Sequence, residues 1–114
     1  MRTRNILLAS LLVALCGCQP EMPREFAANA AEWKLAEKHG CFMCHKPGKN
    51  LLGPAWEAVA ERYRNNPDVE AHLMDRIANG SIGAWVNKKM PGYPENLLNE
   101  ADRRALAKFI MSLQ

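Results

Sequence analysis

The sequence predicts a small all-α domain, and three observations lead to that prediction. Apolar residues recur three or four positions apart in four segments, which is the spacing of one face of a helix. No segment shows the two-residue alternation of a half-buried strand, and the sequence contains no internal repeat. A chain of 114 residues has room for one small domain.

The first two helices are expected over residues 26–39 and 55–64. The first segment is rich in alanine, contains no helix breaker, and places three apolar residues on one face: Phe26, Ala30 and Trp33. Pro54 predicts the start of the second helix, because proline is favoured where a helix begins. The run Asn65-Asn66-Pro67 then ends this helix.

Two more helices are expected in the second half of the chain. Pro67 opens one that ends at Asn79 and Gly80, with apolar residues at four-residue spacing: Val69, Leu73 and Ile77. Asn99 is expected to cap the last helix, with Asp102 three residues on in an arrangement close to a capping box. The apolar stripe of this helix consists of Leu106, Phe109, Ile110 and Leu113.

The chemistry of the domain is expected to centre on the segment Cys41-Phe42-Met43-Cys44-His45. Two thiols at this spacing project from one helical turn, where they can add across the two vinyl groups on one side of a haem. The histidine next to the second cysteine is then held beneath the iron as its fifth ligand. The motif occurs once, which predicts one covalently attached haem c.

Other uses of Cys41 and Cys44 fit the sequence less well. A thioredoxin-like dithiol requires a βαβ setting, and structural zinc requires a second Cys pair or a His pair. A disulfide between the two cysteines would close a very small loop and stabilise little. Two loops rich in glycine and proline, residues 46–53 and 80–99, also need a group to pack against, which a porphyrin would provide.

The sixth ligand of the iron has five candidates: Met74, Met90, Met111, His39 and His72. Two of the methionines fall within helical patterns, where methionine usually fills the core. His39 is too near the attachment site to reach the opposite face of the ring, and His72 lies in the middle of a helix. Met90 is favoured, because it lies in a distant loop stiffened by two prolines. With both axial positions filled, no vacancy remains for a substrate, so we expect no enzymatic activity.

The N-terminus is expected to be an export signal. Arg2 and Arg4 form a basic start, and residues 6–15 are an apolar run that is too short to span a bilayer. Gly17 and Cys18 resemble the lipobox of bacterial lipoproteins, in which a small residue precedes a lipidated cysteine. The alternative is an ordinary signal peptide that is cut nearby, with the early cysteines discarded.

The chain is therefore expected to divide into a lipoprotein-type signal peptide (1–17), a tether (18–24) and a monohaem domain (25–114). Removing 17 of the 114 residues leaves 97, with 13 Lys and Arg against 12 Asp and Glu. Such a nearly neutral domain is not suited to bind nucleic acid. Export would place it in the periplasm, held by its lipid on a bacterial membrane.

From Cys41 onward the sequence resembles the short bacterial class I cytochromes c, small periplasmic donors to nitrite reductases and terminal oxidases. The resemblance rests on Cys41–His45, Leu52-Gly53-Pro54-Ala55, Arg76-Ile77, Asn79-Gly80-Ser81, Gly83, Trp85, Met90-Pro91 and Leu106-Ala107-Lys108. It implies four to five helices wrapped around one covalent haem. It also implies a protein that shuttles single electrons between a redox donor and a redox acceptor, and we expect this protein to be a monomer.

The resemblance further implies roles for individual residues. His45 and Met90 would be the axial ligands of the iron. The carbonyl of Pro54 would accept a hydrogen bond from the ring of His45 and so fix its orientation. Arg76 and Trp85 would hydrogen-bond a haem propionate.

The sequence departs from the family pattern on both sides of Met90. Residues 86–89 replace the proline-bearing stretch that usually leads into the methionine, and Tyr93 stands where the family often has an asparagine bonded near its sulfur. A displaceable Met90 would suit an alternative function, a haem-based gas sensor or a peroxide-reactive haem protein. Lys88 and Lys89 are either solvated loop charges or a docking mark for an acidic partner.

Overall fold

The computed structural model describes residues 21–85 and 88–113 and confirms the all-α prediction. The expected signal peptide over 1–17 and the lipidation candidate Cys18 lie outside these residues. Of the expected tether, residues 21–23 have no regular structure, and Arg24 already begins the first short helix. Within the two described ranges, no helix is long and apolar enough to cross a membrane.

Helices make up most of the described structure. There are two short 3₁₀ helices and four α-helices, in the order η1 (Arg24–Asn29), α1 (Ala30–Lys38), η2 (Cys41–Met43), α2 (Trp56–Tyr63), α3 (Val69–Asn79) and α4 (Glu100–Met111). Two antiparallel pairs of two-residue strands lie in the loops: β1 (His45–Lys46) with β2 (Lys49–Asn50), and β3 (Ser81–Ile82) with β4 (Lys89–Met90).

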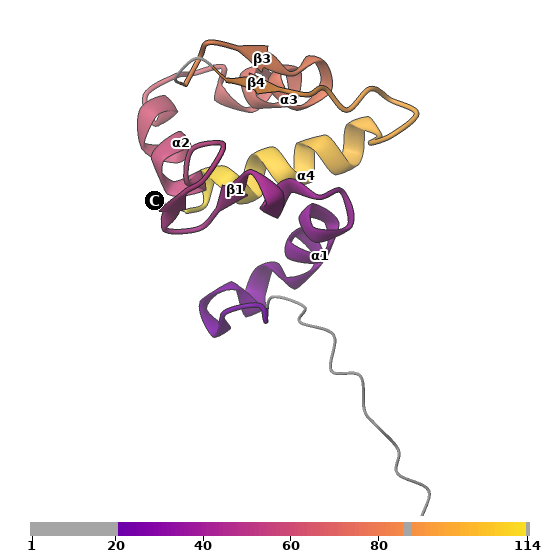
Figure 1. Cartoon of the computed structure of the whole chain (residues 1–114). Coiled ribbons are helices and arrows are strands. Elements are labelled where there is room, and N and C mark those ends of the chain that lie inside the picture. Colours follow the sequence, from indigo (N-terminus) through magenta and orange to yellow (C-terminus); the bar gives the residue numbers. More distant parts are fainter. Residues whose placement is uncertain (1–20, 86–87, 114) are drawn as a thin grey trace, which may run out of the picture.

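Helix α4 is the centre of the fold. It contacts α1, α2 and α3, and Figure 1 shows it crossing between α1 on one side and α3 with the β3–β4 pair on the other. Three of the four residues of its expected stripe face inward, because Leu106, Phe109 and Ile110 are 2–7% exposed, whereas Leu113 lies beyond the end of the helix and is half-buried. Its start is also as expected, since the backbone N–H of Asp102 donates to the side chain of Asn99.

Five aromatic rings form a closed circuit of contacts in one half of the core. Phe26 packs on Trp33 and Phe109, and Phe42 lies between Trp33 and Trp56. Trp56 then meets Phe109 edge-on, with 5.5 Å between the ring centroids. The five residues come from η1, α1, η2, α2 and α4, so this circuit joins the N-terminal segment and the Cys41–Cys44 turn to the rest of the fold.

The helix boundaries differ from the expected ones at the first and third helices. The first segment is not one helix, because Asn29 has φ −114° and ψ 30°, outside the α region, and separates η1 from α1. The third helix begins at Val69 rather than at Pro67, after Asn66 accepts a hydrogen bond from the backbone of Asp68. The strands are two residues long, too short to show an alternating pattern in the sequence.

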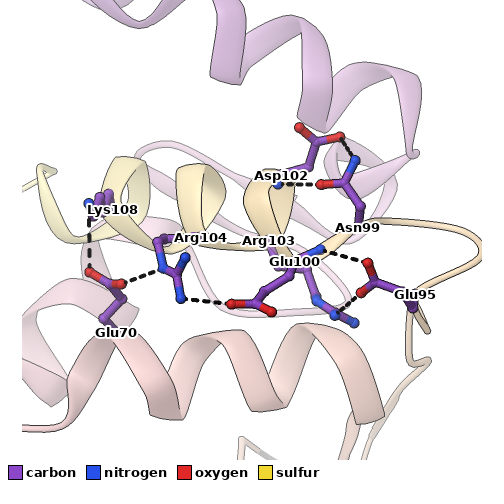
Figure 2. Close-up of polar contacts among 8 residues, drawn as sticks. All are labelled: Glu70, Glu95, Asn99, Glu100, Asp102, Arg103, Arg104 and Lys108. Carbon is purple, nitrogen blue, oxygen red and sulfur yellow. Dashed lines mark hydrogen bonds and ion pairs between the residues drawn. The ribbon is translucent and has the colours of Figure 1, made fainter.

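Charged side chains join the outer surfaces of α3 and α4 (Figure 2). Arg104 donates to Glu70 on α3 at 2.9 Å and to Glu100 one helical turn away at 2.8 Å, and Lys108 lies 4.0 Å from Glu70. These side chains are 44–65% exposed. Ion pairs so open to water contribute little to stability, about 0–1 kcal/mol each. The apolar contacts therefore hold the two helices together.

Candidate cofactor-binding site

A cavity of about 380 Å³ lies between the helices and the β3–β4 pair. Its lining brings together every residue that the sequence singles out for the cofactor: Cys41, Cys44, His45, Pro54, Arg76, Trp85 and Met90. The other walls are mainly apolar side chains of α2, α3 and α4, among them Val59, Leu73, Ile77, Leu106 and Ile110. Such a cavity suits a large apolar group with a few polar contacts at defined points.

Cys41 and Cys44 begin and follow the short helix η2 and are both half-buried. Burial, opposed by a hydrogen bond to its own backbone and reinforced by Cys44, raises the pKa of the Cys41 thiol to about 11. Cys41 is therefore a protonated thiol at neutral pH. The turn places both sulfur-bearing residues on one side of the cavity, as attachment to two neighbouring vinyl groups requires.

The imidazole of His45 is oriented by a backbone carbonyl. Its Nδ1 atom lies 2.8 Å from the carbonyl oxygen of Pro54. Burial lowers the pKa of His45 below its ordinary value, against the opposing effect of this bond. The neutral ring can then donate from Nδ1 to Pro54 and keep the lone pair of Nε2 for a metal.

The loop that supplies this carbonyl is held on both sides. The backbone N–H of Gly53 donates to the carbonyl of Cys44 at 2.8 Å, and that of Ala55 donates to the side chain of Asn50 at 2.7 Å. Gly53 itself passes so close to His45 that a Cβ atom there would lie 2.7 Å from the Cε1 of the ring. Glycine at this position leaves room for the imidazole.

Met90 reaches the cavity from the β3–β4 pair, where it lies opposite Ser81. The other candidates for a sixth ligand, Met74, Met111, His39 and His72, do not line the cavity. The backbone of Met90 crosses the end of α3 closely, because a Cβ at Gly80 would clash with the carbonyl oxygen of Met90. Gly80 also has φ +73°, a conformation that other residues rarely adopt.

Arg76 carries an unsatisfied donor at the cavity. Its Nε atom is buried and has no hydrogen-bond partner among residues 21–85 and 88–113, whereas its Nη2 lies 3.4 Å from the carboxylate of Asp75. A buried N–H without an acceptor is costly, and a carboxylate accepts strongly from a guanidinium. The cavity thus offers a place for an acidic substituent of the bound group.

Trp85 is held in place by Arg62, a residue that no sequence pattern singles out. The guanidinium of Arg62 lies 4.4 Å from the ring centroid of Trp85 and donates to the carbonyl of Ala84 at 2.7 Å. This contact spans 22 residues, so no local pattern reveals it. Tyr63, beside Arg62 on α2, also lines the cavity and was not predicted to do so.

The residues present fit a haem. The apolar walls suit the macrocycle, the paired thiols suit its vinyl groups, and the unsatisfied Nε of Arg76 suits a propionate. Imidazole nitrogen and thioether sulfur are a common pair of iron ligands in electron-transfer haem proteins. The donor set is therefore consistent with the haem c that the motif predicts.

Comparison with known proteins gives the same family. The model of the Cytochrome c family matches residues 33–114. Cytochrome c-552 of Nitrosomonas europaea is 34% identical over 97 residues, which cover 78% of this chain and 92% of the relative. Cytochrome c2 of Rhodocyclus tenuis is 33% identical over 88 residues, 75% of this chain and 95% of the relative.

Solved structures share the fold. The crystal structure of wild-type Nitrosomonas europaea cytochrome c552 has a TM-score of 0.66 at 34% identity, covering 72% of this chain and 99% of its own. The class 1 cytochrome MtoD from Sideroxydans lithotrophicus has a TM-score of 0.65 at 29% identity, covering 75% and 95%. The chain belongs to the cytochrome c family, with the class I fold, and is an electron-transfer protein carrying one covalent haem c rather than an enzyme.

Proposed function

We propose that Cys41 and Cys44 attach the haem through thioethers and that His45 and Met90 are its axial ligands. The observation that carries this proposal is that a single cavity is lined by both potential ligands. They belong to β1 and β4, which lie apart in Figure 1, so a planar group between them could be ligated from two sides. Met90 is the one candidate for the sixth ligand among the five that reaches this cavity.

The bound haem would supply an iron that gains and loses one electron. The protein would keep the same two ligands in both states, so little rearrangement accompanies each transfer. His45 would be held by the Pro54 carbonyl, and Met90 by the close crossing at Gly80. The apolar walls from α2, α3 and α4 would exclude water from the ring.

The polar edge of the haem would lie toward Arg76 and Trp85. The free Nε of Arg76 would donate to a propionate, and Arg62 would keep Trp85 in position to do the same. The Arg76 side chain is 43% exposed, and its positive charge near the ring would destabilise the oxidised, more positive iron more than the reduced iron. Arg76 would therefore raise the reduction potential as well as bind the propionate.

Electrons would enter and leave near Lys88 and Lys89. Both lysines are exposed and both line the cavity, so they lie at its rim. Positive charge at that place would steer an acidic redox partner toward the haem edge. Short-lived contacts of this kind suit a carrier that must leave its partner quickly.

We further propose that the protein acts in the periplasm as a monomer and is anchored to a bacterial membrane through a lipid on Cys18. Gly17 before Cys18, the apolar run 6–15 and the basic start support this proposal. The 18–24 segment would then be the tether between the anchor and the haem domain.

The substitution Met90→Ala tests the ligand assignment. We expect the covalent haem to remain, because its attachment depends on Cys41 and Cys44, and the ferrous protein to gain carbon monoxide binding. Met74→Ala is the matched control, since Met74 is half-buried but does not line the cavity. Unchanged carbon monoxide binding in Met90→Ala would contradict the assignment. Rapid binding by the wild-type protein would favour the sensor or peroxide-reactive alternative.

A further inference from the structure

Tyr93, three residues after Met90, is bonded to three different helices. Its backbone N–H donates to the carbonyl of Ile77 in α3 at 2.8 Å. Its backbone carbonyl accepts from Nη1 of Arg103 in α4 at 3.3 Å. Its hydroxyl donates to the carbonyl of His39, the residue that ends α1, at 3.0 Å. One residue thus fixes the segment after Met90 from three directions.

The bond to His39 connects the two sides of the cavity. His39 lies two residues before Cys41, so it is joined to the attachment turn by a very short stretch of chain. Tyr93 lies three residues after Met90 and itself lines the cavity. The contact spans 54 residues, and it limits how far the Met90 segment can move away from the Cys41–Cys44 turn.

We propose that Tyr93 is a positioning residue that keeps Met90 on the iron by tying the Met90 segment to the end of α1. This inference rests on the proposed ligation by Met90. A tyrosine hydroxyl has a single proton, and here His39 accepts it. Tyr93 therefore acts through the backbone of the segment and does not donate a hydrogen bond to the methionine sulfur.

Contacts with neighbouring side chains also hold Tyr93 in one position. Arg103, whose side chain is 12% exposed, bonds Glu95 as well as the Tyr93 carbonyl (Figure 2 shows the Glu95 contact). The ring of Tyr93 meets that of His39 edge-on, with 6.2 Å between the centroids. Burial raises the pKa of Tyr93 above its ordinary value, so the hydroxyl keeps its proton at neutral pH.

The adjoining backbone is packed just as closely. A Cβ atom at Gly92 would lie 2.6 Å from the carbonyl oxygen of Ala78, so the chain passes directly over the end of α3. This crossing and the Tyr93–Ile77 bond hold the segment to α3, whereas the hydroxyl holds it to α1. Removing the hydroxyl alone should loosen the link across the cavity and leave the link to α3 intact.

The test is Tyr93→Phe in the full-length protein with its haem attached. The ring and both backbone bonds remain, and only the bond to His39 is lost. Loss of a hydrogen bond of ordinary strength should raise about fivefold the population in which the Met90 segment has moved away from the iron. We therefore expect carbon monoxide to bind the ferrous variant about fivefold faster than the wild type. Amide hydrogen exchange should quicken by a similar factor at Met90, Gly92 and Tyr93, and the sulfur-to-iron charge-transfer band should vanish at a lower temperature.

Tyr63→Phe is the matched control. Tyr63 also lines the cavity, packs its ring on His72 at 4.6 Å, and lies far from the Met90 segment in sequence. We expect it to leave amide hydrogen exchange at Met90, Gly92 and Tyr93 unchanged. Arg103→Lys is a second variant, which keeps a cation beside Glu95 but weakens the bond to the Tyr93 carbonyl, and it should shift the same readouts in the same direction.

The inference would be overturned if Tyr93→Phe matched the wild type in amide exchange, in the rate of carbon monoxide binding and in the temperature at which the charge-transfer band vanishes. That result differs from a failure of the proposed ligation. If Met90 is not the ligand, the wild-type protein itself lacks the charge-transfer band, and Met90→Ala leaves carbon monoxide binding unchanged. The two proposals can therefore fail independently in the same set of measurements.

Discussion

The Nδ1 atom of His45 lies 2.8 Å from the carbonyl oxygen of Pro54, and this contact fixes the direction in which the imidazole faces. The bond fixes which ring nitrogen carries the proton, and the lowered pKa of His45 keeps the ring neutral. A neutral, oriented imidazole is ready to ligate iron without a prior loss of a proton. The loop from Asn50 to Ala55 serves this contact, because its own hydrogen bonds leave the Pro54 carbonyl little freedom.

Replacing Arg76 by alanine should lower the reduction potential. The guanidinium at the cavity favours the reduced haem, and a loss of about 1 kcal/mol of this interaction corresponds to about 40 mV for one electron. Redox titration of the holoprotein measures the change. Arg64→Ala is the control, since Arg64 is 46% exposed, pairs with Glu61 and does not line the cavity. An equal shift in both variants would contradict the role of Arg76.

Phe109→Ala should strongly destabilise the fold. Phe109 is 2% exposed and meets both Phe26 and Trp56 edge-on in the aromatic circuit. Truncation of such a residue leaves a cavity and costs about 3–5 kcal/mol in the free energy of unfolding. Denaturant titration measures it. Leu97→Ala, at a position 57% exposed, should cost well under half as much. Similar losses would show that the circuit is not central to stability.

Reversing the charge of Lys88 and Lys89 should change electron transfer with charged reagents in opposite directions. At low ionic strength we expect the double variant Lys88→Glu, Lys89→Glu to be oxidised about tenfold more slowly by ferricyanide and faster by a cationic cobalt complex. Both effects should shrink in high salt. The control is Lys34→Glu, Lys38→Glu on α1, which is exposed but away from the cavity. Equal rates in the two double variants would place electron exchange elsewhere.

Cys18→Ser should release the protein from membranes. A lipid anchor requires a thiol at the position that follows the cleavage site, and serine cannot accept the lipid. Fractionation of cells that express the full chain, followed by haem staining, measures the distribution. Cys16→Ser is the matched control and should remain membrane-bound. Membrane association of the Cys18→Ser protein would refute the anchor.

The helices were largely predictable because their signals are local. The stripe of Leu106, Phe109 and Ile110 and the cap at Asn99 need only a few consecutive residues to be recognised, and the structure confirms both. The break between η1 and α1 was not predictable in this way. An alanine-rich run permits a 3₁₀ helix or an α-helix. Here residues 24–29 form the 3₁₀ helix η1, in which Phe26 is buried against distant Phe109.

The residues of the site were likewise predictable where their signal is local and not where it depends on distant parts of the chain. The spacing of Cys41, Cys44 and His45 carries its own chemistry, so the attachment motif was evident from the sequence. Met90 was favoured from its place in a distant loop with two prolines, whereas the role of Arg76 was expected only by resemblance to a family. The contacts of Arg62 with Ala84 and of Tyr93 with His39 span 22 and 54 residues, and no short pattern encodes them.

The absorption spectrum of the wild-type protein tests the central claim, that His45 and Met90 ligate one covalent haem, most directly. The protein would be expressed with haem-attachment machinery and recorded oxidised and then reduced. We predict haem bands in both forms together with the weak red sulfur-to-iron charge-transfer band in the oxidised form. Haem bands without the sulfur band would contradict ligation by Met90, and the absence of any haem bands would contradict the attachment site at Cys41 and Cys44.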